Sequence, residues 1–113
     1  MVQNRNKLID LFIGNISNSI THKILEKAID NKEIASKYER ELNISWKIAK
    51  KYREKINPLN RALQSKDVVY IKAQIVNKVR AELLMRISKG YRGINLDFVK
   101  ELVDKALRDM GVI

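Results

Sequence analysis

The chain has no cysteine, one proline, four glycines and one histidine among its 113 residues. Without cysteine it can form no disulfide and offers no thiolate for a metal site or for catalysis. His22, the single histidine, has no second histidine or cysteine with which to share a metal ion. No apolar run approaches the roughly 20 residues that span a bilayer, and the start of the chain lacks a signal-peptide cleavage pattern. We therefore expect a cytoplasmic protein that holds no metal or other cofactor and enters no membrane.

The arrangements of side chains that usually carry catalysis are also missing. Most carboxylates have a lysine or arginine three or four residues away, as in Glu101–Lys105 and Asp104–Arg108. This spacing is typical of a stabilised helix surface rather than of an acid–base pair. No serine lies in a nucleophile elbow, and no glycine-rich segment has the spacing of a P-loop. The sequence predicts that the protein is not an enzyme.

Between the single proline and the four glycines, the main pattern is helical periodicity. Apolar residues recur at three- and four-residue spacing over residues 9–28, 31–41, 45–56, 66–89 and 96–110. Gly14 leaves open whether the first segment is one helix or two. The segment 66–89 is the most apolar around its circumference, so we expect it to be the central helix, with Val69 and Ile87 on its buried face. The prediction is one all-α domain, residues 1–113, folded as a compact bundle of about five helices.

Several side chains mark where these helices begin and end. Asp30, with Glu33 three residues later, predicts a capping box before the second segment. Asn43 tolerates the left-handed conformation that ends a helix, and Ser45 is a favourable cap for the next one. Asn95 is expected to cap the last helix. These signals divide residues 31–56 into two short helices with a turn between them.

Positive charge is concentrated in the middle of the chain. The chain has 23 Lys and Arg residues and 13 Asp and Glu residues, which give a net charge of +10. The excess falls within residues 31–93, whereas the charges of the two ends nearly cancel. A basic centre of this kind predicts a surface that binds a polyanion, and nucleic acid is the commonest one.

Residues 38–56 resemble the helix-turn-helix motif of DNA-binding proteins. Leu42 closes the first helix, Asn43 stands where the family usually has a turn glycine, and Ile44 is the buried turn residue. Glu39 departs from the family, which prefers a small residue there. The resemblance implies a helix-turn-helix within residues 32–56 that sets its second helix into the major groove of DNA, usually as a dimer.

The predicted binding residues lie on this second helix and on a later loop. On the helix, Lys50, Lys51 and Arg53 are expected to contact phosphates, and Ser45, Trp46 and Lys47 to lie nearest the bases. Trp46 would stack on a base if the target is single-stranded. The alternative is that Trp46 packs against the first helix or a partner chain, and that the lysines form a solvated face. The complete set of predicted nucleic-acid-binding residues is Lys37, Ser45, Trp46, Lys47, Lys50, Lys51, Arg53, Arg86, Lys89, Tyr91 and Arg92.

The sequence thus predicts a small basic nucleic-acid-binding protein in transcription or replication control, with DNA favoured over RNA, acting as a homodimer or in a larger complex. One alternative is a non-catalytic helical subunit or domain of a nucleic-acid machine, such as a primase, a polymerase or a ribonucleoprotein effector. Another is an adaptor or antitoxin whose basic face binds an acidic protein.

Overall fold

The structure, a computed structural model, describes residues 5–56 and 63–113, and within these ranges the regular elements are all helical. The elements are α1 (Arg5–Ala28), α2 (Lys32–Ile56), α3 (Ser65–Ser88), the short 3-10 helix η1 (Leu96–Phe98) and α4 (Val99–Asp109). The all-α prediction is confirmed. The described part of the chain has four α-helices instead of about five, because residues 32–56 form one helix.

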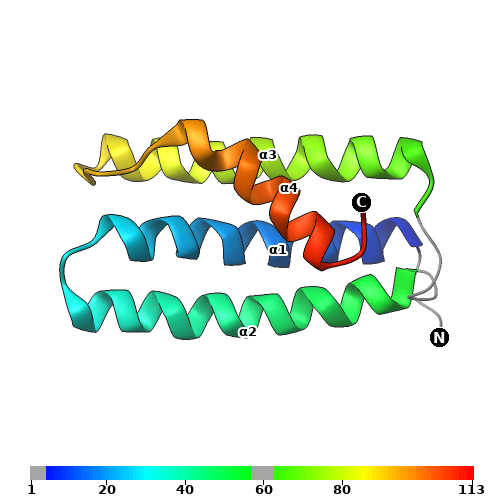
Figure 1. Cartoon of the computed structure of the whole chain (residues 1–113), viewed down its shortest axis with the longest axis horizontal. Coiled ribbons are helices and arrows are strands. Elements are labelled where there is room, and N and C mark those ends of the chain that lie inside the picture. Colours follow the sequence, from blue (N-terminus) through cyan, green and yellow to red (C-terminus); the bar gives the residue numbers. More distant parts are fainter. Residues whose placement is uncertain (1–4, 57–62) are drawn as a thin grey trace.

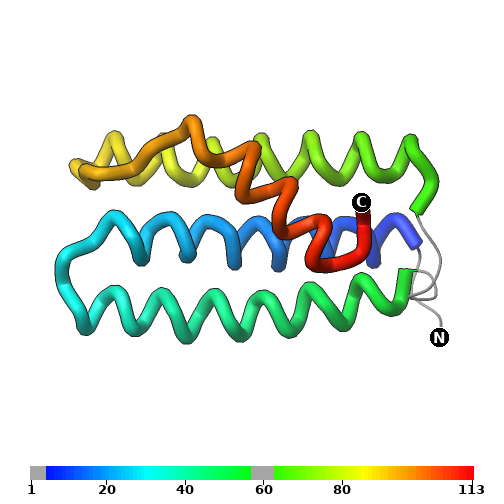
Figure 2. The backbone as a smooth tube through the Cα atoms, in the orientation of Figure 1, coloured from blue at the N-terminus to red at the C-terminus, as the bar shows by residue number. Residues whose placement is uncertain are grey.

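The three long helices lie side by side, with α1 between α2 and α3, and α4 runs obliquely across α3 and α1 (Figure 1). α1 and α2 form a tight antiparallel hairpin, whose short connection is visible at one end of the tube in Figure 2. Gly14 does not interrupt α1, so the first segment is one helix. Because α1 contacts all three other α-helices, it is the central element of the bundle.

The core is therefore centred on α1 and not, as we expected, on the segment 66–89. Half of the residues of α1 are buried, including small polar ones, whereas α3 buries only Ile71, Ile75, Val79 and Leu83. The expected inward residue Val69 is 69 % exposed, and Ile87 is also exposed. The apolar side chains of α3 spread around its circumference, so periodicity did not single out the buried face. In α1, the buried Ser19 keeps a hydrogen-bond partner, because its hydroxyl donates to the carbonyl of Leu42.

α2 continues through Asn43 without a turn, which corrects the predicted helix-turn-helix. No described residue other than glycine has a positive φ, so Asn43 does not adopt the left-handed conformation that the turn required. Two contacts hold this region of α2 along α1: the Ser19 hydroxyl donates to the carbonyl of Leu42 at 2.9 Å, and the Asn18 amide donates to Ser45 Oγ at 2.9 Å. Asparagine costs only a fraction of about 1 kcal/mol inside a helix, which this packing offsets.

The helix ends follow the sequence with one change. Asn31, not Asp30, caps α2, because its side chain accepts hydrogen bonds from the backbone N–H groups of Glu33 and Ile34. Asn95 accepts from the backbone N–H of Asp97 and caps η1, whereas the last helix that we expected it to cap, α4, begins later, at Val99. In the described ranges, no helix combines the length and the apolar character needed to cross a membrane.

Candidate functional site

Four lysines project from the C-terminal half of α2 and form what we call the α2 lysine surface: Lys47, Lys50, Lys51 and Lys55. All four are exposed. Residues 43–56 contain a single acidic residue, Glu54. Lys47, Lys51 and Lys55 follow one another at four-residue spacing, so they lie on one side of the helix, while Lys50 lies nearer Trp46. Among the described residues, 5–56 and 63–113, none of these four lysines forms an ion pair. The surface therefore presents uncompensated positive charge.

Ser45 and Arg53 lie beneath this surface and not on it. Ser45 is buried and accepts the hydrogen bond from Asn18. Arg53 is only 1 % exposed, and its guanidinium donates to the carbonyl of Gly111 at 2.9 Å, which ties α2 to the chain beyond α4. Burial lowers the pKa of Arg53, since the charged form loses hydration. The structure assigns both residues to the packing of the bundle, so neither is placed to reach a phosphate or a base.

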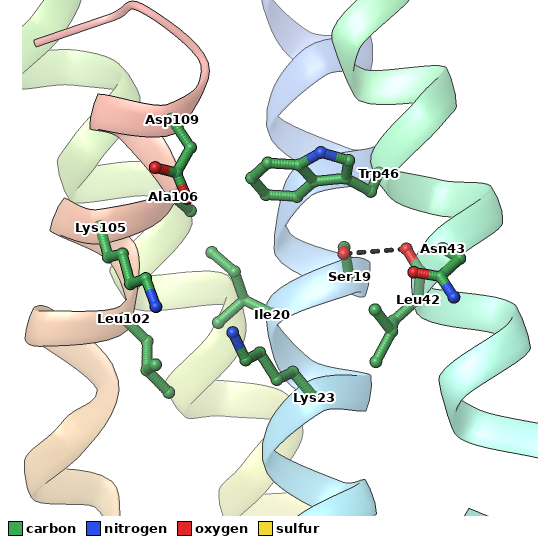
Figure 3. Close-up of a pocket in the computed structure, with 10 residues that line it drawn as sticks. All are labelled: Ser19, Ile20, Lys23, Leu42, Asn43, Trp46, Leu102, Lys105, Ala106 and Asp109. Carbon is green, nitrogen blue, oxygen red and sulfur yellow. Dashed lines mark hydrogen bonds between the residues drawn. The ribbon is translucent and has the colours of Figure 1, made fainter. Parts of the chain in front are cut away.

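Trp46 is half-buried and packs against the core, which agrees with the alternative that its ring contacts neighbouring helices. One part of the indole remains accessible, because it lines a pocket of ≈ 200 Å³ between α1, α2 and α4. Figure 3 shows the ring at one end of this space and the side chains of Lys23 and Lys105 extending into the other. The lining residues of this Trp46 pocket are Ser19, Ile20, Lys23, Leu42, Asn43, Trp46, Leu102, Lys105, Ala106 and Asp109.

Sequence reasoning missed Lys23, Lys105 and Asp109. The only signal was their spacing: Ile20 and Lys23 lie one turn apart on α1, and residues 102, 105, 106 and 109 share one face of α4. This spacing does not indicate that these faces of α1 and α4 lie close together, or that Trp46 of α2 lies beside both.

Arg86 and Tyr91 belong to a polar cluster where the loop after α3 packs onto α1 and α2. The Tyr38 and Tyr91 hydroxyls lie 3.4 Å apart, and Arg86 donates to Tyr91 Oη at 3.4 Å and to Glu82 at 3.2 Å. The hydrogen bond with Tyr38, then the one with Arg86, lowers the pKa of Tyr91, while the bond with Tyr91 raises the pKa of Tyr38. These contacts hold the loop in place, and they leave Arg86 and Tyr91 less available to a ligand than predicted.

His22 belongs to the same cluster. It stacks on Tyr38 with ring centroids 5.4 Å apart, and its Nε2 lies 3.3 Å from a Glu41 oxygen. Burial is the main reason that the pKa of His22 is lowered, although Glu41 opposes the shift. Over the described ranges, no group of three or more histidine, aspartate or glutamate side chains is arranged to hold a metal ion.

The remaining predicted residues are exposed but divided between two places. Lys37 lies near the N-terminal end of α2, and Lys89 and Arg92 flank the cluster after α3. Lys47, Lys50 and Lys51 lie farther along α2. The structure thus brings together Trp46 and the three lysines that follow it, and it places the loop residues at the end of the bundle where α2 begins.

No protein-family model, curated protein or solved structure matches this chain.

Proposed function

We propose that this protein binds nucleic acid, without catalysing a reaction, through the α2 lysine surface. The observation that supports the proposal is that four exposed lysines without an ion pair among the described residues project from the C-terminal half of α2, with Lys50 nearest the Trp46 pocket. Lysines that contact phosphates release condensed counterions, and this release favours binding to any polyanionic strand. Because α2 is one continuous helix packed along α1, the backbone positions of these lysines have the regular spacing of a helix. Such a surface suits transcription or replication control, or a non-catalytic subunit of a nucleic-acid machine.

The test is a triple variant, Lys47→Gln/Lys50→Gln/Lys51→Gln, measured by fluorescence anisotropy with labelled duplex DNA, single-stranded DNA and RNA over a range of salt concentrations. The matched control, Lys66→Gln/Arg80→Gln/Lys100→Gln, removes the same charge from exposed positions on α3 and α4. Each lost phosphate contact lowers the slope of log K against log salt by about 0.7–0.9. We expect the first variant to lose about two units of slope and the control to keep nearly all of it. Equal losses would show that net charge, and not this surface, is responsible.

A second candidate function is binding of an acidic protein, and two exposed isoleucines favour it. Ile44 is 60 % exposed and Ile48 is also exposed, and both lie among the lysines of α2. Apolar side chains within a basic surface match an acidic amphipathic helix. In this case heparin would compete for the surface, whereas the three nucleic acids would bind weakly and equally.

A further inference from the structure

The Trp46 pocket has an aromatic surface at one end and two cations at the other end. The indole lies at one end, and the ammonium groups of Lys23 and Lys105 approach each other at the other end, over Ile20 and Leu102 (Figure 3). Neither lysine forms an ion pair within the described residues. A ligand that satisfies both ends has a flat ring system and an anionic group a short distance away. A nucleotide has this shape, since its base stacks on aromatic side chains and its phosphate binds cations.

The size of the pocket limits the ligand. Its volume of ≈ 200 Å³ is below the roughly 300–1,000 Å³ of pockets that hold drug-sized molecules or large cofactors. One nucleotide is therefore a better match than a dinucleotide cofactor. A base enters such a pocket only when it is unstacked, which is the ordinary condition of a single strand.

Asp109 introduces a preference among bases. Its carboxylate lies at the Trp46 end of the pocket, away from the two ammonium groups (Figure 3). Asp109 is also the last residue of α4, where a negative charge opposes the helix dipole, so the fold gains nothing obvious from it. An ionised carboxylate only accepts hydrogen bonds. It suits the exocyclic amino group of cytosine, adenine or guanine, whereas thymine and uracil place two carbonyl oxygens beside their ring N–H.

A second hollow lies next to the Trp46 pocket and is also lined by residues of α1 and α4. It has a volume of ≈ 300 Å³, shares Leu102 with the Trp46 pocket, and is lined by Lys27 and by Phe98, which is 53 % exposed. Lys27 follows Lys23 at four-residue spacing on α1, so both lysines lie on one side of that helix. An aromatic ring and a lysine are thus available to the neighbouring nucleotide.

From these features we infer that the Trp46 pocket binds one unstacked nucleotide of a single strand, with an amino-bearing base between Trp46 and Asp109 and its phosphate between Lys23 and Lys105. The inference rests on the proposed function, because the α2 lysine surface supplies the general affinity for the strand. Lys50 follows Trp46 by one helical turn and so connects that surface with the pocket.

The experiment titrates the whole protein with short oligodeoxycytidine and oligothymidine while recording anisotropy and the emission of Trp46, the only tryptophan. We expect quenching of Trp46 and about tenfold tighter binding of oligodeoxycytidine, as one charge-assisted hydrogen bond provides. Asp109→Asn should reduce this preference to less than about twofold without lowering the melting temperature, and Asp10→Asn, on the exposed side of α1, should leave it intact. Lys23→Gln/Lys105→Gln should weaken the binding of both oligonucleotides by about tenfold.

Trp46→Leu tests whether the indole stacks on a base. Tyr52→Leu is the matched control, because it also removes a half-buried aromatic side chain from α2. The first variant should weaken single-strand binding about tenfold more than the second. If strands bind with the lysine-dependent salt slope but Trp46 is not quenched and cytidine is not preferred, the pocket inference is wrong and the proposed function stands. If no strand binds, yet cytidine monophosphate quenches Trp46 more than uridine monophosphate does, the pocket is a nucleotide site and the proposed function fails.

Discussion

Replacement of Arg53 by alanine is expected to destabilise the fold by about 3 kcal/mol. The hydrogen bond from a charged donor to the Gly111 carbonyl contributes about 1.5–3 kcal/mol. Alanine also removes two buried methylene groups, at about 0.8 kcal/mol each. Removal of the buried charge also removes its desolvation cost. The expected destabilisation is therefore near the lower end of the range given by the hydrogen bond and the two methylene groups together. For a domain of this size, the melting temperature should fall by about 10 °C.

Arg53→Met separates these contributions. Methionine keeps an apolar stem of similar length and loses only the guanidinium, so we expect a loss of about 1–2 kcal/mol. Urea unfolding monitored by circular dichroism gives both free energies, and the anisotropy assay gives the salt slope. If the protein binds nucleic acid as we propose, each variant that folds should bind with the wild-type slope, because Arg53 is buried beneath the α2 lysine surface. An Arg53→Ala protein with wild-type stability and a slope reduced by about one would refute the burial of Arg53 and return this residue to the binding surface.

Two further predictions concern pH and backbone conformation. The pKa of His22 is lowered from its usual 6.5, chiefly by burial, so the unfolded state binds a proton more readily than the folded state. Stability is therefore complete above pH 6.5 and decreases as the pH falls from 6.5 towards the lower pKa of the folded state. His22→Gln should flatten the dependence in this window, as measured by urea unfolding, and an NMR midpoint of His22 at or above 6.5 would contradict the reasoning. Alanine substitutions at two glycines should have opposite effects on stability. A Cβ at Gly14 meets nothing within 4 Å, so Gly14→Ala should stabilise α1 by about 0.5–1 kcal/mol. Gly93 has φ +79° and lies beside the Ala28 backbone, so Gly93→Ala should destabilise the fold by about 1–2 kcal/mol. Thermal unfolding checks both, and losses at both positions would contradict the assignment of Gly14 to a helix with open space around it.

Local signals predicted the helices of this protein better than they predicted the boundaries between them. The periodicity over residues 66–89 and 96–110 predicted helices close to those found, since α3 spans Ser65–Ser88 and residues 96–109 form η1 and α4. The interruption predicted at Asn43 was wrong, because its preference for a turn is weaker than the contacts that hold α2 along α1. Intrinsic propensity is a weak constraint where a long interface is available.

The exposure of the candidate site residues was predicted for some of them and not for others. Lysines 47, 50 and 51 are exposed, as a basic segment on an amphipathic helix requires. The same reasoning placed Arg53 on the surface, because a helical wheel treats a basic residue at the edge of an apolar face as exposed. Only the chain beyond α4, which supplies the Gly111 carbonyl, explains why this arginine points inward.

The sequence by itself determined that the chain is helical, without cysteine chemistry, and basic in its middle, since these properties depend on composition and on spacing within one helix. The tertiary structure decided which helix is central, which cations are buried, and which side chains from separate helices share one pocket. These outcomes depend on contacts between residues far apart in the chain. Lys23, Trp46 and Lys105 come from three helices and line one pocket only because α1 packs against both α2 and α4.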